Sequence, residues 1–351
     1  MSYQGFAIHD TTKYNEAKKI TFKARTVGDY DVVIKVDHCG ICGTDVHTAT
    51  GGWGGPILPV IPGHEIIGSV TKIGDKVTLF KVGDRVGVGA QVDACWSCKA
   101  CDMGEETYCK DVIDTYNSTK NGEVIYGGYS NYVSANEQFA FGVPKQLDKA
   151  EAAPLFCAGI TVFAPLKRAI TKPGMKVGIV GIGGLGHMAI QFAAALGAEV
   201  YAMSRGDSKK EDSLKMGAKH YIDTTKENWA APYKMEFDFI LSCANSNKGF
   251  TGDYFSCLTV YGNYVSAGLP ETPFELKAQH FIGNGASFGS SHLGNRKEML
   301  EMLELAAKNN ILPWTEVLPI SEENVKLGLT KTYKGDVRYR VALTDYAAAF
   351  D

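Results

Sequence analysis

The sequence predicts a mixed α/β protein in which a doubly wound parallel sheet is inserted into a second, β-rich domain. Residues up to about 150 carry short Val- and Ile-rich runs broken by glycine, such as 31–36 and 82–88, which are typical of twisted β structure. Between residues 151 and 289, strand-like and helix-like segments alternate, which favours parallel strands connected by helices. After residue 290 the alternation ends.

The inserted domain is expected to open with a strand, a helix and a second strand. A buried strand is predicted over 176–181, an Ala-rich packed helix over 185–196 and a strand over 199–204. Three later segments are expected to be strands: 237–241, 262–266 and 286–289.

The tail is expected to rejoin the first domain. Leu and Met recur at intervals of three and four residues over 296–308, which predicts a helix, and 337–343 is expected to be a closing strand. We therefore assign residues 1–150 and 290–351 to one domain, and residues 151–289 to the other.

The composition narrows the possible partners. The 351 residues carry a net charge of −3, so there is no broad positive field to hold nucleic acid or an anionic membrane. No run reaches about 18 apolar residues, and no basic segment followed by an apolar run opens the chain. We expect a cytoplasmic protein that binds neither nucleic acid nor membranes.

Four of the nine cysteines form a cluster. Cys95, Cys98, Cys101 and Cys109 are separated by two, two and seven residues, so that four thiolates can surround one ion. An all-cysteine tetrahedral zinc site is typically structural and contributes folding energy. An iron–sulfur cluster is the alternative, but no proline follows the last cysteine and no second set exists.

A glycine-rich segment predicts a dinucleotide site. Gly181-Ile-Gly183-Gly184-Leu185-Gly186 satisfies G-x-G-x-x-G between a predicted strand and a predicted helix. These glycines permit a tight turn and close approach of a diphosphate to the helix N-terminus. The alternative is a glycine-rich turn without a ligand.

The end of the next strand favours NADP(H) over NAD(H). An NAD site usually has an acidic residue there, whereas this strand ends in Ser204-Arg205, with Lys209 close behind. A hydroxyl and two cations can hold a 2′-phosphate. Asp207 is a complication, because a flexible loop could bring it to the ribose, and a solvated charged loop is the alternative.

A second metal constellation is dispersed along the chain. Cys39 and His64 could bind catalytic zinc with a second thiolate, since Cys₂His is a recognised ligand set. Spacing alone cannot select that thiolate. Cys157 has no advantage over three other cysteines: Cys42, Cys243 and Cys257.

Several segments of the chain resemble a known family. The segment 63–68, Gly-His-Glu-Ile-Ile-Gly, with Gly74 and Val77, matches the zinc alcohol dehydrogenase signature of the medium-chain dehydrogenase/reductase superfamily. Four further segments resemble its cinnamyl alcohol dehydrogenase group, which includes fungal NADP-dependent alcohol dehydrogenases: 87–90, 153–159, 176–181 and 335–340. The resemblance implies a GroES-like catalytic domain and a Rossmann nucleotide-binding domain.

The resemblance also implies the reactive metal site. Cys39, His64 and Cys157 are expected to bind catalytic zinc, with Glu65 as an occasional ligand. Asp45 is similar to the family's carboxylate that orients the zinc-bound imidazole. Its alternative role is a helix N-cap.

Further roles concern the hydride and the proton. Zinc is expected to act as a Lewis acid while nicotinamide exchanges the hydride, and Thr44 with His47 resembles the family's proton relay. Arg340 lies where relatives place an arginine that reaches the cofactor pyrophosphate, with Arg338 as the neighbouring alternative. Ser204, Arg205 and Lys209 fall on positions that NADP-dependent members use.

The substrate is expected to be an aromatic or medium-chain aliphatic alcohol or aldehyde. Trp53, Ile57 and Leu58 are expected to line an apolar pocket. Asp114 and His292 replace aromatic residues of the lignin-forming relatives, which weakens a strict cinnamyl assignment.

The alternatives to this reading are a zinc polyol dehydrogenase, a zinc-free quinone reductase on the same scaffold and a non-enzymatic zinc module. By analogy we expect a homodimer, formed through the late strands around 286–290.

Overall fold

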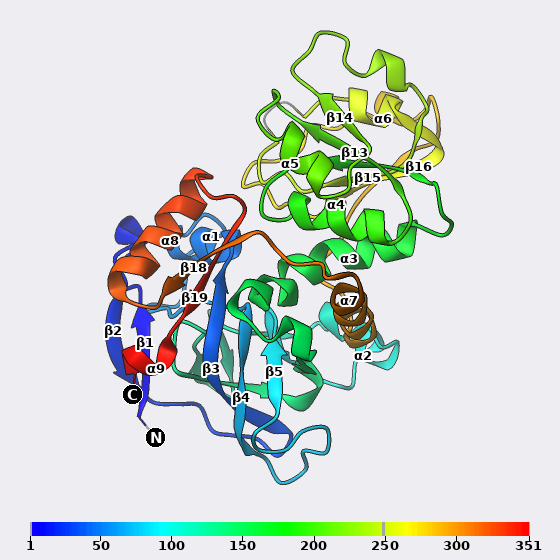
Figure 1. Cartoon of the computed structure of the whole chain (residues 1–351). Coiled ribbons are helices and arrows are strands. Elements are labelled where there is room, and N and C mark those ends of the chain that lie inside the picture. Colours follow the sequence, from blue (N-terminus) through cyan, green and yellow to red (C-terminus); the bar gives the residue numbers. More distant parts are fainter. Residues whose placement is uncertain (1, 248–249, 351) are drawn as a thin grey trace. The chain divides into compact units, whose positions relative to one another are not determined.

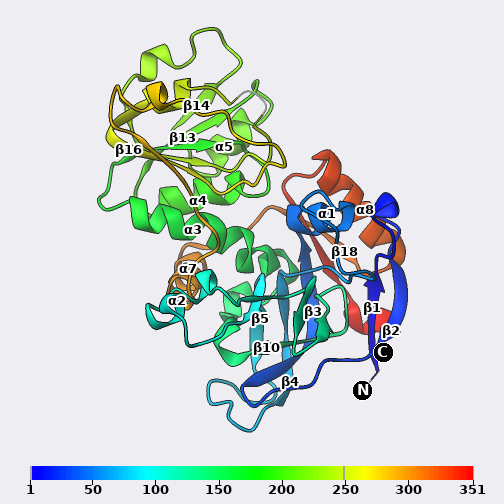
Figure 2. The same ribbon diagram turned by 180° about the vertical axis from the view of Figure 1, so that it is seen from behind.

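The computed structural model describes residues 2–247 and 250–350 and divides the chain into two compact units (Figures 1 and 2). Unit 1 contains the residues up to Cys157 and those from Gly294 onwards, and unit 2 comprises Ala158–Leu293. Both divisions fall a few residues after positions 150 and 290. The two units are described separately below.

Unit 1 is built on a seven-stranded, mainly antiparallel sheet. The strand order is β11-β5-β4-β3-β19-β18, and β10 also pairs with β3. The bounds are β3 Asp31–Ile41, β4 Ile66–Ile73, β5 Arg85–Val88, β10 Tyr132–Asn136, β11 Ala140–Gly142, β18 Thr315–Pro319 and β19 Arg340–Thr344. β19 inserts between β3 and β18, so the tail completes the sheet, as expected.

Smaller elements surround this sheet. Three two-stranded sheets are formed by β1 Tyr3–Ala7 with β2 Lys18–Phe22, β6 Gln91–Asp93 with β7 Ile113–Asp114, and β8 Ser118–Lys120 with β9 Glu123–Ile125. The α-helices are α1 Gly43–Thr50, α2 Lys99–Asp102, α7 Arg296–Asn309, α8 Glu322–Lys334 and α9 Tyr346–Phe350. α8 packs against α1 and β19. A 3₁₀ helix, η5 Ala150–Phe156, lies against β3 and β19.

The core of unit 1 reflects the alternation of its strands. Val32, Ile34 and Val36 of β3 are buried together with Ile66 of β4 and Val86 of β5. Successive side chains of a strand point to opposite faces, so residues two apart share one face. The same alternation decides which residues at the C-terminal end of β3 face the candidate site.

Unit 2 contains a six-stranded parallel sheet in the order β14-β13-β12-β15-β16-β17. The bounds are β12 Lys176–Val180, β13 Glu199–Ser204, β14 His220–Asp223, β15 Phe237–Ser242, β16 Leu258–Ser266 and β17 Ser287–Ser290. The helices are α3 Ala158–Ala169, α4 Gly186–Ala195, α5 Lys210–Lys215 and α6 Asp253–Ser256. The order starts at the central β12 and proceeds outwards in both directions, which confirms the doubly wound sheet.

The strands and helices predicted by residue range in unit 2 and the tail are present. The strands β14 and β18 and the helices α3, α8 and α9 were not predicted. The closing strand begins at Arg340 instead of residue 337.

Among the described residues, no single helix is long and apolar enough to cross a membrane. Two consecutive helices, Ala150–Phe156 and Ala158–Ala169, meet that criterion only when they are taken together.

Candidate active site and metal centres

Four buried side chains of unit 1 form a candidate metal site. Ligand atoms of Cys42, His64, Glu65 and Cys157 all lie within 4.8 Å of one another. Cys42 is the N-cap of α1, directly after β3, while His64 and Glu65 immediately precede β4 and Cys157 ends η5. The site therefore draws on three segments that are far apart in the sequence.

The structure corrects the prediction for Cys39, which is not part of this group. Cys39 lies within β3 and is completely buried in the hydrophobic core. Its thiol is 3.5 Å from the carbonyl oxygen of Gly40. A Cβ atom built on Gly40 would approach Glu65, so the side of β3 at Gly40 faces the site and that at Cys39 faces away. Cys42, three positions beyond Cys39, is the thiol that reaches the group.

Asp45 is buried beside the candidate metal site, and its carboxylate contacts four surrounding groups. Oδ2 accepts hydrogen bonds from the Cys42 amide at 2.8 Å and the Tyr129 hydroxyl at 3.0 Å. Oδ1 accepts one from the Gly63 amide at 3.1 Å and lies 3.3 Å from His64 Nδ1. This is the geometry that an orienting role requires, because it directs the other imidazole nitrogen toward the metal group. Asp45 is not the N-cap of α1, which is Cys42; it is the third residue of the helix and accepts from the Cys42 amide in a capping box.

The thiols and the imidazole are close enough to share an ion. His64 Nε2 is 3.2 Å from Cys157 Sγ. A hydrogen bond from Cys157 holds the pKa of Cys42 well below its usual range, and the same bond together with burial raises the pKa of Cys157. One thiolate and a neighbouring imidazole are ligands that zinc prefers.

Glu65 and Arg340 form a buried ion pair next to this group. Glu65 Oε1 accepts from the Arg340 guanidinium, and both residues are at most 5% exposed. Glu65 Oε2 is buried and has no hydrogen-bond partner among the described residues, as expected of an oxygen left available for a cation. Burial raises the pKa of Glu65 to about 7 although Arg340 opposes the shift. The predicted contact of Arg340 with the cofactor stays a prediction.

Thr44 and His47 lie on α1, one helical turn apart and both half-buried. The Thr44 hydroxyl is 3.6 Å from Cys42 Sγ, at the edge of the candidate metal site. The His47 ring stacks on Trp53, with centroids 4.4 Å apart and planes inclined by 14°. The two residues therefore lead from the buried thiol toward the surface.

Two tyrosines of this site were not predicted. The buried Tyr116 ring stacks on His64 with a centroid distance of 5.6 Å, and Tyr129 donates to Asp45. Both come from segments without a recognisable motif, so the sequence carries no signal for them.

The predicted substrate residues are found on exposed segments. Trp53, Ile57 and Leu58 are large apolar side chains with 43%, 38% and 43% exposure. Asp114 is exposed on β7, and partial desolvation raises its pKa while the nearby His64 opposes the shift. His292 is exposed in unit 2, so the substrate role of these residues stays a prediction.

The four-cysteine cluster has the dimensions of a tetrahedral zinc site. The Sγ distances are 3.6 Å for Cys98–Cys101, 3.9 Å for Cys98–Cys109 and 3.4 Å for Cys95–Cys109. Four sulfurs about 2.3 Å from one ion lie about 3.8 Å apart in a tetrahedron. All nine cysteines are free, so no disulfide competes for these thiols.

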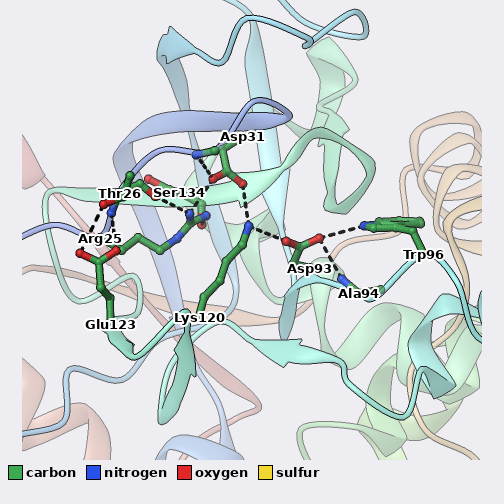
Figure 3. Close-up of polar contacts among 10 residues, drawn as sticks. Arg25, Thr26, Asp31, Asp93, Ala94, Trp96, Lys120, Glu123 and Ser134 are labelled. Atoms are coloured by element: carbon green, nitrogen blue, oxygen red, sulfur yellow. Dashed lines mark hydrogen bonds and ion pairs between the residues drawn. The ribbon is translucent and has the colours of Figure 1, made fainter.

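Asp93 fixes the loop that carries the cluster (Figure 3). Its Oδ1 accepts from the Trp96 indole N–H and the Ala94 amide, both at 2.9 Å. Lys120 lies 2.5 Å from Asp93 Oδ2 and 3.4 Å from Asp31 Oδ1, so one ammonium joins two buried carboxylates. The cysteine loop is thereby connected to β3.

Asp31 extends this network into the sheet (Figure 3). Its other oxygen is 2.6 Å from Arg25, which also donates to the Ser134 carbonyl group at 3.1 Å. Two cations, Arg25 and Lys120, thus balance the two carboxylates. Such balance is what makes buried charges tolerable.

The glycine-rich turn of unit 2 has the geometry of a dinucleotide site. Gly181 has φ +83°, which favours glycine, and a Cβ on Gly186 would lie 2.0 Å from the Gly181 carbonyl oxygen. A Cβ on Gly183 would meet nothing within 4 Å, so the space there is open to a ligand. The three glycines therefore provide the turn, the approach and the packing that a bound diphosphate needs.

Ser204, Arg205 and Lys209 lie on one loop, residues 204–209, between β13 and α5. Ser204 ends β13, and Lys209 is the N-cap of α5. Arg205 is exposed and forms no ion pair with any residue that the structure describes. A hydroxyl and two cations thus share the carboxyl edge of the parallel sheet, where such folds bind their ligands.

The fold and the candidate zinc sites define the class as a zinc-binding dehydrogenase. The family model of the alcohol dehydrogenase GroES-like domain matches residues 28–145, and that of the zinc-binding dehydrogenase matches residues 184–308. The NADP-dependent alcohol dehydrogenase 6 of Saccharomyces cerevisiae is 40% identical, covering 99% of this chain and 98% of its own.

Two solved structures agree with this class. A cinnamyl alcohol dehydrogenase of Sorghum bicolor has a TM-score of 0.92 and 35% identity, covering 98% of both chains. A Helicobacter pylori enzyme of the same name, complexed with NADP(H), has a TM-score of 0.88 and 36% identity, again over 98% of both. The chain belongs to the zinc-containing medium-chain alcohol dehydrogenases, in their cinnamyl alcohol dehydrogenase-like group.

Proposed function

We propose that this dehydrogenase transfers a hydride between NADP(H) and aromatic or medium-chain aliphatic alcohols and aldehydes. The observation that carries the proposal is the buried group of Cys42, His64 and Cys157 with the Thr44 hydroxyl beside it. These three ligands would hold zinc and leave a fourth position for substrate. Zinc bound there supplies a Lewis acid that polarises an aldehyde oxygen or lowers the pKa of an alcohol.

The chain's own side chains provide for the proton. Thr44 would exchange it with the substrate oxygen, and His47 would pass it to solvent, since an imidazole can both accept and donate a proton. Asp45 holds His64 in the required orientation through the contact to Nδ1. The exposed apolar side chains of Trp53, Ile57 and Leu58 favour aromatic and aliphatic substrates over polyols.

The cofactor assignment is supported by the 204–209 loop and by the relatives. Arg205 has no ion-pair partner among the described residues, and a 2′-phosphate would supply one. The yeast relative is named as NADP-dependent, and the Helicobacter pylori structure is described as a complex with NADP(H). Two zinc ions per chain are proposed, one in each candidate site.

A spectrophotometric assay tests the proposal. Metal-replete protein is assayed at 340 nm with NADPH and then NADH against a panel of aromatic aldehydes, aliphatic aldehydes and ketose sugars. We expect NADPH oxidation with the first two classes. A preference for ketoses would indicate the polyol dehydrogenase, and oxidation of neither cofactor would refute the function.

We also propose a homodimer. β17 is a terminal strand of the unit 2 sheet, so one edge has backbone groups available for a second copy. Light scattering should give twice the 38.0 kDa of one chain. A mass of one chain at micromolar concentration would contradict it.

For the compartment we propose the cytoplasm. Nine free cysteines, six of them in the candidate metal sites and three in the buried core, suit a reducing environment. Cell fractionation with the activity assay tests this assignment.

A further inference from the structure

Gly206 is held at both of its backbone polar groups by side chains of β14. Its N–H donates to Asp223 Oδ1 at 2.8 Å, and its carbonyl oxygen accepts from the Tyr221 hydroxyl at 2.5 Å. Tyr221 and Asp223 are two residues apart on the strand and therefore project from the same face. Gly206 directly follows Arg205, the residue proposed to bind the 2′-phosphate.

The two hydrogen bonds restrict Gly206, the residue of the 204–209 loop with the greatest intrinsic backbone freedom. Gly206 has φ +66°, and a Cβ there would meet nothing within 4 Å, so surrounding atoms do not fix it. Glycine has more backbone freedom than any other residue, and that freedom must be lost when the loop is ordered. Holding both peptide groups of Gly206 fixes the direction in which Arg205 leaves the strand.

The Tyr221 hydroxyl also reaches the other two members of the proposed phosphate site. The side chain of Ser204 and the backbone of Lys209 both act to lower the pKa of Tyr221, so its hydroxyl lies within their electrostatic reach. Burial raises the pKa of Tyr221, so the hydroxyl stays protonated and can donate at neutral pH. One hydroxyl group thus binds the residue after Arg205 directly and acts electrostatically on the residue before it and on the N-cap of α5.

We propose that Tyr221 is a positioning residue that sets the preference for NADPH over NADH by ordering the 204–209 loop around the 2′-phosphate. The inference rests on the proposed function, because the 2′-phosphate is the only part that distinguishes the two cofactors. Tyr221 acts through Ser204, Gly206 and Lys209 and is not itself proposed to touch the phosphate. Its loss should therefore weaken binding of NADPH while leaving the NADH reaction unchanged.

Tyr221→Phe removes the hydroxyl and keeps the ring, and Tyr201→Phe is the matched control. The Tyr201 hydroxyl donates to Glu199 at 2.9 Å at the other end of the neighbouring strand β13, away from the loop. KM and kcat are measured for NADPH and for NADH with one aldehyde. For Tyr221→Phe we expect KM for NADPH to rise about three- to tenfold, the range for one lost hydrogen bond. KM for NADH, and both constants of Tyr201→Phe, should change less than about twofold.

Arg205→Asp, measured alongside, separates this inference from the proposed function. If Arg205→Asp lowers the preference for NADPH but Tyr221→Phe does not, the inference is wrong and the phosphate site stands. If neither variant changes the preference, both are wrong. Equal increases of KM for both cofactors in Tyr221→Phe would show a merely structural role and would also overturn the inference.

Discussion

At the scale of single residues, the position of Cys42 decides how the candidate active site is composed. The segment Cys39-Gly-Ile-Cys42 contains two thiols, of which the family resemblance predicts the first as a zinc ligand. The alternation of side chains along β3 places Cys39 in the hydrophobic core and Gly40 toward Glu65. A missing side chain at position 40 leaves the space that Glu65 occupies.

Replacing each thiol in turn tests this correction. Cys42→Ser should lose one of two zinc ions per chain and lower kcat at least about 100-fold, because a ligand and its charge are removed. Cys39→Ser should keep both ions and most of the activity, at some cost in stability from the buried hydroxyl. Zinc is counted by mass spectrometry of the metal and compared with the assay at 340 nm. The reverse pattern would restore Cys39 as the ligand.

The sequence could predict those residues of the candidate active site that lie close together along the chain. Thr44, Asp45 and His47 share one helix, and His64 and Glu65 follow within one motif, so a resemblance assigns them together. The tyrosines at 116 and 129 reach the site only through the fold. No spacing rule relates such positions to His64.

At the scale of elements, the cysteine loop depends on the network that joins it to β3. Lys120 is the only cation drawn between the two carboxylates in Figure 3, and its side chain is 20% exposed. Without it, Asp93 and Asp31 would repel each other across a partly desolvated space. Asp93 would then hold the Trp96 indole less firmly.

Lys120→Met keeps the length of the side chain and removes its charge. We expect a chelator to extract the ion of the four-cysteine site at least about threefold faster, because the loop opens more often. Lys110→Met is the control, since Lys110 lies on the same loop with its side chain 75% exposed. Zinc release is followed with a colorimetric chelator. Equal rates in the two variants would exclude a role for the network.

The Arg25–Asp31 pair should make the stability of unit 1 sensitive to acid. Burial would raise the pKa of Asp31, but the hydrogen bond and charge of Arg25 outweigh it, and the pKa is lowered. A lowered folded-state pKa stabilises the protein above the unfolded value of about 3.9, and this contribution is lost as the pH falls through the folded value.

Asp31→Asn removes this contribution. At pH 7 it should cost about 3 kcal/mol, because Arg25 is left buried without its counter-charge. The difference between the urea midpoints of the two proteins should stay constant from pH 7 to about pH 4 and begin to shrink as the pH falls further toward about pH 3. A constant difference across the whole of this range would show that the ion pair does not titrate as described.

The missed elements share a physical reason. β14 is a four-residue edge strand in which His220, Tyr221 and Asp223 are not deeply buried, so it lacks the apolar run that reveals β12 and β15. The closing strand was expected too early because Val337 is apolar, yet it stands outside β19. Long buried strands and helices can be predicted from their apolar residues. Short edge strands lack such a pattern, because they form only when a neighbouring strand pairs with them.

At the scale of the whole molecule, the change of texture near residues 150 and 290 was enough to predict an inserted domain. Each unit has its own buried cluster, one around β3 to β5 and one around β15 and β16. The sequence could indicate this because a parallel sheet and an antiparallel sheet bury different patterns of residues. The metal ligands from distant segments could not be paired in the same way.

Binding of NADPH should increase the free energy of unfolding of the protein. NADPH at 100 times its Kd adds about 2.7 kcal/mol to the unit that binds it. Gly183→Asp should fold, since its Cβ has open space, but its carboxylate would repel the diphosphate and abolish the thermal shift. Gly142→Asp, also in open space but in unit 1, is the control. A full NADPH-induced shift in Gly183→Asp would place the cofactor elsewhere.

The insertion of unit 2 also sets an order for biosynthesis. When residue 293 has left the ribosome, the parallel sheet of unit 2 has all six strands, whereas the sheet of unit 1 still lacks β18 and β19. β3 then exposes the edge that β19 will cover, and the buried Glu65 has no guanidinium to balance it. A nascent chain interrupted before residue 340 would therefore release a nucleotide-binding unit attached to an unfinished, aggregation-prone sheet.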